Sequence, residues 1–158
     1  MALLVQKYGG TSVGTIEKIE NVAEKVIASK QAGNDVVVVV SAMSGETNRL
    51  IDLAKQISPN PDPREYDVLV ATGEQVTIAL LSMAIVKRGH SARSYTGSQV
   101  HIRTDNAYTK ARIMEIDEQR VRQDLTEGRI VVVAGFQGID ENNNITTLGR
   151  GGSDTTPT

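Results

Sequence analysis

Three glycine-rich segments of this sequence have the composition of loops that bind phosphate. They are Lys7-Tyr8-Gly9-Gly10-Thr11-Ser12-Val13-Gly14, Ser41-Ala42-Met43-Ser44-Gly45 and Gly149-Arg150-Gly151-Gly152-Ser153-Asp154-Thr155-Thr156. Glycines let backbone N–H groups approach an anion closely, and helix N-termini beside such loops add partial positive charge. Any one of these segments is also compatible with a simple tight turn. The three together, with a lysine at the start of the first, favour a ligand with several anionic oxygens.

Four charged residues in or near these loops are candidates for the chemistry. Lys7 would neutralise charge that develops on a transferring phosphoryl group. Arg150 is flanked by glycines, so its guanidinium would be open to a bidentate contact with a carboxylate, although a plain loop arginine has the same pattern. Asp154 would cap a following helix, or orient a lysine or a metal-bound phosphate. Glu74 follows Thr72-Gly73 and is by default a solvated helix residue.

Composition argues against several other classes of function. The chain has no cysteine, which excludes disulfides, thiolate zinc sites and cysteine nucleophiles. A net charge of -2, no tryptophan and one phenylalanine argue against nucleic-acid binding. The glycines fit neither G-x-x-x-x-G-K-[ST] nor G-x-G-x-x-G. We interpret His90 and His101 as surface residues and predict no protein-built metal site.

The N-terminus of this 158-residue sequence lacks the long apolar run of a signal peptide, and its apolar runs are of strand length. We therefore expect that no stretch approaches the length of a membrane span. A cytoplasmic protein with no membrane partner is the resulting prediction.

The elements that must position the loops are strands and helices in alternation. Continuous apolar runs at residues 3–6, 36–40 and 130–134 predict strands buried on both faces, as in parallel sheets. Between the first two lies a predicted helix that Thr15 caps and Gly33 closes. The predicted fold is α/β, a doubly wound, mostly parallel sheet with helices on both faces. Ligands of such sheets bind beyond the carboxyl ends of the strands, where the loops fall.

The remaining elements are less regular. A second helix is predicted after residue 45, and a long helical region from about residue 64 to residue 88. The glycine of Thr72-Gly73 weakens that helix, so we expect a break or bend there. Further predictions, all from the same sequence, are a weaker strand at 92–95, a helix at 117–125 capped by Asp117 and closed by Gly128, and a hairpin strand at 145–148.

Five blocks of the sequence resemble the aspartate kinases of the amino-acid-kinase fold, in that family's order and spacing over the whole chain. The blocks are Lys7-Tyr8-Gly9-Gly10-Thr11-Ser12, Ser41-Ala42-Met43, Ala71-Thr72-Gly73-Glu74, Ala134-Gly135-Phe136-Gln137-Gly138 and Thr147-Leu148-Gly149-Arg150-Gly151-Gly152-Ser153-Asp154-Thr155-Thr156. The resemblance implies that residues 1–158 form the N-terminal portion of the catalytic domain. The nucleotide-base subregion and the regulatory ACT domains would then lie outside this chain, and the isolated chain would be weakly active or inactive.

The activity implied by the resemblance is ATP-dependent phosphorylation of the aspartate side-chain carboxylate, with Mg²⁺. The product would be 4-phospho-aspartate, the first step toward lysine by way of diaminopimelate, threonine and methionine. The implied ATP-phosphate contacts are Lys7, Tyr8, Gly9, Gly10 and Ser41. The implied aspartate contacts are Thr47, Glu74, Arg150, Gly151, Gly152 and Ser153. Lys7 and Asp154 would be catalytic, with Asp154 organising the lysine.

Two other readings of the sequence stay open. Another kinase of the same fold would act on glutamate, acetylglutamate or UMP, although Arg150 together with Glu74 favours a free α-amino acid. A protein of a different class would be a noncatalytic fragment that binds a partner chain or a small anion. The expected assembly is a homo-oligomer, or association with other aspartate kinase chains.

Overall fold

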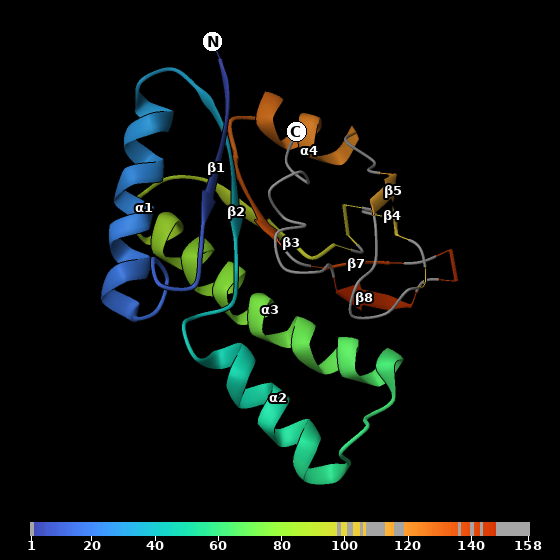
Figure 1. The fold of residues 1–158 in the computed structure, drawn as a ribbon. Coiled ribbons are helices and arrows are strands. Elements are labelled where there is room, and N and C mark those ends of the chain that lie inside the picture. Colours follow the sequence, from blue (N-terminus) through green and yellow to red (C-terminus); the bar gives the residue numbers. More distant parts are fainter. Residues whose placement is uncertain are drawn as a thin grey trace.

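The computed structural model describes residues 2–97, 99–100, 103–104, 106, 113–115, 119–135, 137–139, 141–142 and 144–147. Its centre is a four-stranded sheet in the order β1-β2-β6-β3 (Figure 1). The strands are β1 (Leu3–Tyr8), β2 (Asp35–Val40), β6 (Ile130–Ala134) and β3 (Ala92–Tyr95), and all neighbours pair in parallel. The predicted α/β fold with a parallel sheet is confirmed.

Helices cover both faces of this sheet, as predicted. On one face, α1 (Ile16–Gln31) and α3 (Pro63–Lys87) share one hydrophobic cluster with the even-numbered residues of β2 and β6. On the other face, α4 (Gln119–Thr126) packs its Leu125 against odd-numbered residues of the same strands. The remaining helix, α2 (Glu46–Ile57), packs against α3.

A second, smaller sheet was not predicted as a separate unit. Its order is β5-β4-β7-β8, formed by β5 (Ile113–Glu115), β4 (Arg103–Thr104), β7 (Gln137–Ile139) and β8 (Ile145–Thr147). The predicted hairpin strand is confirmed over residues 145–147, which pair antiparallel with β7. Arg64 Nε of α3 donates to Asn144 Oδ1 beside this hairpin at 2.6 Å, so the small sheet contacts the N-terminal end of α3.

The prediction that the first strand is buried on both faces is wrong. β1 is the edge strand, and its burial alternates along the chain because α4 covers β6 and β3 but not β1. Leu3 and Val5, on the α4 side, are 53% and 40% exposed. The prediction holds for β2 and β6, whose apolar residues are buried without interruption.

The helix termini are largely as predicted. The Thr15 side chain accepts a hydrogen bond from Lys18 N at 3.2 Å and so caps α1. Gly33 and Gly128 both have positive φ angles, 99° and 84°, just beyond the ends of α1 and α4. Asp117, the predicted cap of α4, lies outside the described residues.

The predicted break at Thr72-Gly73 is wrong, because α3 runs without interruption from Pro63 to Lys87. Asp62 caps its start by accepting from Glu65 N at 3.1 Å. A glycine in a helix interior costs about 1 kcal/mol relative to alanine, which tertiary packing readily offsets. Gly73 is buried and faces Ala42, so its missing side chain serves a close contact instead of a bend.

The expectation that no stretch reaches the length of a membrane span is also wrong. By length and composition alone, α3 is apolar enough to cross a membrane. Of its most apolar window, 44% is buried inside the protein. Its buried residues include the acidic side chains of Asp67 and Glu74.

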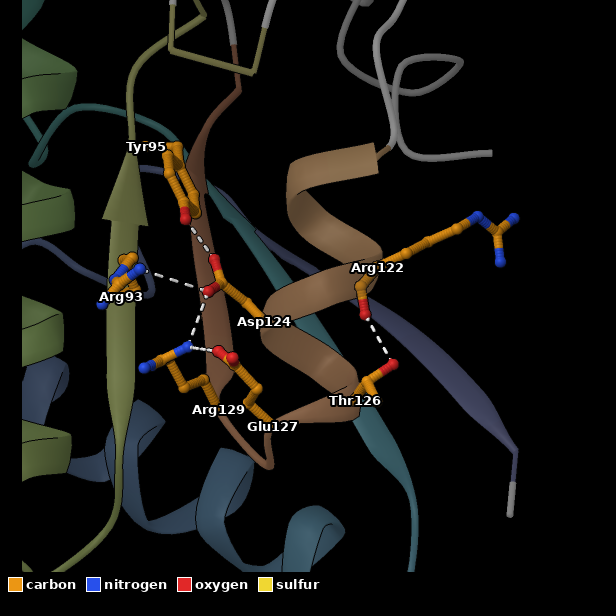
Figure 2. A network of polar contacts seen from close by, with 7 residues as sticks. All are labelled: Arg93, Tyr95, Arg122, Asp124, Thr126, Glu127 and Arg129. Carbon is orange, nitrogen blue, oxygen red and sulfur yellow. Dashed lines mark hydrogen bonds and ion pairs between the residues drawn. The ribbon is translucent and has the colours of Figure 1, made fainter.

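A polar network fixes α4 to the sheet (Figure 2). The Asp124 carboxylate of α4 is buried, and it accepts hydrogen bonds from Tyr95 Oη, from Arg93 at 3.3 Å and from Arg129 at 3.0 Å. Burial, and then the hydrogen bond to Asp124, raise the pKa of Tyr95. Because a buried carboxylate is costly unless it is paired, this set of donors defines where α4 sits on β3 and β6.

Candidate active site

The carboxyl ends of β1, β2 and β6 lie side by side at one edge of the sheet (Figure 1). Tyr8 is in register with Val40, and Val40 with Ala134. The hydrogen-bond ladder continues beyond the strands: Ser41 N donates to Tyr8 O at 3.2 Å, and Gly135 N donates to Val40 O at 3.0 Å. The first two predicted phosphate loops are thus brought together at one edge.

Backbone contacts join the first loop to the second. The carbonyl of Gly10 accepts from Val13 N at 3.3 Å and from Ser44 N at 3.1 Å. A Cβ on Gly10 would lie 3.1 Å from the carbonyl oxygen of Ala42, and one on Gly14 would lie 3.1 Å from the Ser44 side chain. These two glycines are therefore explained by close packing between loops. Gly9 has nothing within 4 Å of an added Cβ, which leaves space beside its backbone for a ligand.

Ala42 links the loops to α3. It is buried between Gly10 and Gly73, and a Cβ on Gly73 would lie only 3.0 Å from the Ala42 Cβ. Ser41 precedes Ala42 in the sequence and Glu74 follows Gly73, and both are predicted site residues. The contact therefore places the backbone beside Glu74 close to the loop that follows β2.

Glu74 is 4% exposed, so its interpretation as a solvated helix residue is wrong. The buried residues of α3 recur at spacings of four and three, and Glu74 falls on that stripe with Asp67, Ala71, Ile78, Leu81 and Ile85. Asp67, which the sequence analysis did not single out, is fully buried as well. Acidic residues at the spacing of a helix's apolar face were the signal that could have identified both.

The remaining described site residues are Lys7, Tyr8 and Thr47. Lys7 is exposed and lies on the face of β1 opposite α1 and α3, because its neighbour Tyr8 packs against the cluster on the α1 side. Partial burial raises the pKa of Tyr8. Thr47 is half-buried in the first turn of α2, whose N-cap Gly45 has a φ of 82° and no side-chain cap. At that helix start, hydrogen bonding from Arg49 lowers the pKa of Glu46.

Several predicted residues lie outside the described part of the chain. These are Arg150, Gly151, Gly152, Ser153 and Asp154, together with His101. Within the described ranges, no group of three or more His, Cys, Asp and Glu side chains is placed to hold a metal ion. His90 is half-buried in the turn after α3, where its N–H donates to Ile85 O at 3.4 Å.

An open cavity of about 520 Å³ lies elsewhere, between β3 and α4. Its lining includes Arg93, Tyr95, Arg120 and Asp124, and none of the loop residues described above. Asp124 and Tyr95 are hydrogen-bonded to each other, so the cavity's buried polar groups are satisfied by the network that holds α4.

Comparison with known proteins gives consistent matches over the whole chain. Residues 2–158 match the model of the amino acid kinase family. The chain is 72% identical over 156 residues to an aspartate kinase of Stutzerimonas stutzeri, covering 99% of this chain and 38% of that protein. It thus spans about 38% of the length of such curated relatives and matches their N-terminal part.

Solved structures agree with this match. An aspartate kinase from Synechocystis superimposes with a TM-score of 0.80 at 52% identity, covering 98% of this chain and 25% of that chain. Aspartokinase III from E. coli has a TM-score of 0.84 at 24% identity, covering 99% of this chain and 45% of that chain, and shows the shared fold. The predicted resemblance is confirmed: this chain belongs to the amino acid kinase family.

Proposed function

We propose that this chain provides the phosphate loops and the substrate pocket of an aspartate kinase. The reaction transfers the γ-phosphoryl group of ATP to the side-chain carboxylate of L-aspartate. A bond forms between a carboxylate oxygen and the γ-phosphorus, the bond from that phosphorus to its β-bridging oxygen breaks, and ADP leaves with 4-phospho-aspartate as the product. The observation that carries the proposal is the junction at Ala42, which joins both loops to the helix of Glu74.

Such a site must bring two anions together, the aspartate carboxylate and the ATP phosphates. Two unit charges of the same sign about 4 Å apart repel by roughly 4 kcal/mol at an effective dielectric constant near 20. In our proposal Lys7 and the backbone of Tyr8, Gly9, Gly10 and Ser41 offset this repulsion at the phosphates. An aspartate carboxylate is already ionised at neutral pH, so the reaction needs no general base.

Mg²⁺ is the proposed metal, and we propose that it enters with the nucleotide. Magnesium in kinases is held by substrate phosphates with one or two carboxylates, which does not require a dedicated protein cage. That arrangement suits the described residues, where no cluster of metal-binding side chains occurs. The ion would supply charge neutralisation at the phosphates.

Glu74 is the proposed partner of the substrate amino group, with Thr47 beside it. An acetylated amino acid or a nucleotide lacks the positively charged amino group that would pair with the Glu74 carboxylate, which supports a free α-amino acid as the substrate. Arg150 is proposed to bind the α-carboxylate, with Gly151, Gly152 and Ser153 completing that loop and Asp154 orienting Lys7. The related E. coli aspartokinase III was solved with aspartate and ADP, which supports the same pair of ligands here.

We further propose that residues 1–158 correspond to the N-terminal portion of a longer cytoplasmic kinase of amino-acid biosynthesis. The chain's share of its relatives' length supports this proposal. The nucleotide-base subregion and regulatory ACT domains would then lie outside residues 1–158. A homo-oligomer is the proposed assembly. Turnover by the chain alone should be weak, and aspartyl phosphate formation at the rate of a complete kinase would refute that expectation.

Calorimetric titration separates this proposal from a noncatalytic module. L-Aspartate and MgATP are titrated separately into the chain, with glutamate, N-acetylglutamate and UMP as controls. Saturable heat with aspartate and weaker or no heat with the controls is the expected result. Tighter binding of a control ligand would reassign the substrate, and the absence of heat with every ligand would favour the noncatalytic alternative.

A further inference from the structure

The open cavity between β3 and α4 shares no lining residue with the proposed kinase site. Its volume of about 520 Å³ falls within the range of small-molecule pockets. Apart from the ring of Tyr95, its lining consists of charged, amide and hydroxyl side chains. An apolar ligand would find no hydrophobic wall there, so the lining favours a small polar molecule.

The acidic side chains of this cavity already have partners. The side chain of Asp124 is only 3% exposed, and its carboxylate accepts hydrogen bonds from Tyr95 Oη and from two arginines, Arg93 and Arg129 (Figure 2). Arg129 also donates to the Glu127 carboxylate. A cation that entered the cavity would have to displace these arginines, so the lining is poorly suited to a positively charged ligand.

Hydrogen-bond donors, by contrast, remain available in the cavity. Arg93 makes one hydrogen bond to Asp124, at 3.3 Å, which leaves most of the N–H groups of its guanidinium unused. Gln99 accepts at Oε1 from Thr96 N at 2.9 Å, so its NH2 group is left to donate. Arg120 is exposed on α4, and within the described ranges no acidic side chain forms an ion pair with it.

From this excess of donors we propose that the cavity binds a small oxyanion with two negative charges, carried by a phosphate group or by two carboxylates. Arginine is the side chain best suited to both groups, because its planar guanidinium donates two parallel hydrogen bonds. Arg93 of β3 and Arg120 of α4 hold the ligand from two sides, with Gln99 and Gln123 as further donors. The site is separate from the proposed kinase site, so failure of the aspartate and MgATP titrations would leave it standing.

The exposure of the two arginines sets the expected strength of binding. The Arg93 side chain is 50% exposed, and Arg120 is exposed as well. Water competes for both guanidinium groups, and salt at about 0.1 M screens exposed charges beyond about 10 Å. Binding of the anion is therefore weak, and it weakens further as the ionic strength rises.

An NMR titration locates the anion, because each backbone amide of the chain reports separately. Inorganic phosphate and succinate are titrated into the isotope-labelled chain at constant ionic strength, with acetate as a monovalent control. Saturable shifts are expected at the amides of Tyr95, Gln99 and Gln123 with a divalent probe, and weaker ones with acetate. The amides of Gly9 and Gly10 report any binding at the phosphate loops. The probe with the lower Kd at the cavity identifies the anionic group.

Two arginines of α4 provide a matched pair of variants. Arg120 lines the cavity, whereas the side chain of Arg122 points away from the Asp124 network (Figure 2). Arg120→Gln should weaken binding of the divalent anion about tenfold, and Arg122→Gln should change it by less than about twofold. Equal weakening in the two variants would overturn the proposal, because it would mean that the anion responds only to the charge of the helix surface.

A third variant tests the sign of the ligand's charge. Glu127→Gln removes a negative charge from the cavity and releases Arg129 from one of its partners, so the anion should bind about twofold more tightly or better. Circular dichroism verifies that each variant is folded. Weaker anion binding in Glu127→Gln would overturn the proposal, and so would the absence of saturable shifts at the cavity with both phosphate and succinate.

Discussion

The contact between Gly73 and Ala42 predicts an unusual response to a glycine-to-alanine change. A methyl group at position 73 would lie 3.0 Å from the Ala42 Cβ and 3.4 Å from Leu50 Cδ1. Carbon atoms prefer a separation of about 3.5–4.0 Å, so the Gly73→Ala variant must move α3 and the loop apart by roughly 0.5–1 Å. Neither Cβ can rotate away, because each is fixed directly to its backbone.

Two opposing free energies decide the outcome for Gly73→Ala. Alanine favours the helix by about 1 kcal/mol over glycine. Overpacking a filled interior costs about 1–3 kcal/mol. The net effect is a loss of about 0–2 kcal/mol in the free energy of unfolding, where helix propensity alone predicts a gain. The displacement also separates Glu74 from the Ser41 loop, so aspartate binding should weaken.

A double-mutant cycle isolates this contact. Ala42→Gly removes the opposing methyl group, and in the Ala42→Gly, Gly73→Ala double variant the new methyl group fills the space. We expect a favourable coupling free energy of about 1–2 kcal/mol, measured by urea unfolding of the chain and its variants. Thr72 lies on the exposed side of the same helix, so the Thr72→Ala variant reports the effect of helix propensity without the contact to Ala42. Its free energy of unfolding should rise by up to ~0.7 kcal/mol.

The reasoning would be refuted by either of two results. One is a Gly73→Ala variant that is stabilised by the full value expected from helix propensity. The other is additivity of the two single changes to within about 0.3–0.5 kcal/mol, the range found for sites that do not touch.

Three further predictions concern the elements that hold the site. Asp124→Asn should lower the free energy of unfolding by about 1.5–3 kcal/mol, because the charge-assisted hydrogen bonds to Asp124 weaken. Unchanged urea unfolding would contradict the role of this network in holding α4 on the sheet. Hydrogen bonds from Arg88, and to a lesser extent from Lys87, lower the pKa of Glu20 to about 2 from an ordinary 4.5. The ionised Glu20 therefore stabilises the fold fully above pH 4.5, and this stabilisation is lost as the pH falls toward 2. The urea midpoints of the chain and Glu20→Gln should therefore converge over that range, and a constant difference would count against the ion pair. Thr15→Ala should lower the free energy of unfolding by about 1 kcal/mol, because the cap of α1 is lost. Thr15→Ser should keep most of the stabilisation from the cap. Equal losses in the two variants would exclude the capping hydroxyl as the cause.

Most strands and helices could be predicted, because apolar runs and capping residues are visible in short stretches of sequence. The continuous apolar runs of β2 and β6 predicted burial on both faces, and Thr15 predicted a cap. The same apolar pattern was misleading for β1, because strand order decides which strand lies at the edge and sequence runs do not encode it.

The packing of the candidate site could not be predicted from its residue types. Gly10 and Gly14 suggested phosphate contact and Gly73 suggested a helix break, whereas all three glycines allow the close approach of separate segments. Contacts of that kind depend on tertiary structure, so a helix propensity scale predicted a break where α3 is continuous. The burial of Glu74 was encoded by its position on the apolar stripe, but its charge suggested solvent.

The most direct test of the proposed aspartate site is the affinity of L-aspartate for the chain and for its Glu74→Gln variant, measured by calorimetry. Glutamine keeps the shape of the side chain and removes the charge that we assign to the substrate amino group. The account predicts saturable binding of L-aspartate to the chain, at least tenfold weaker binding to Glu74→Gln, and little binding of N-acetyl-aspartate to either. Equal aspartate affinity in the two proteins, or no aspartate binding to the chain, would contradict it.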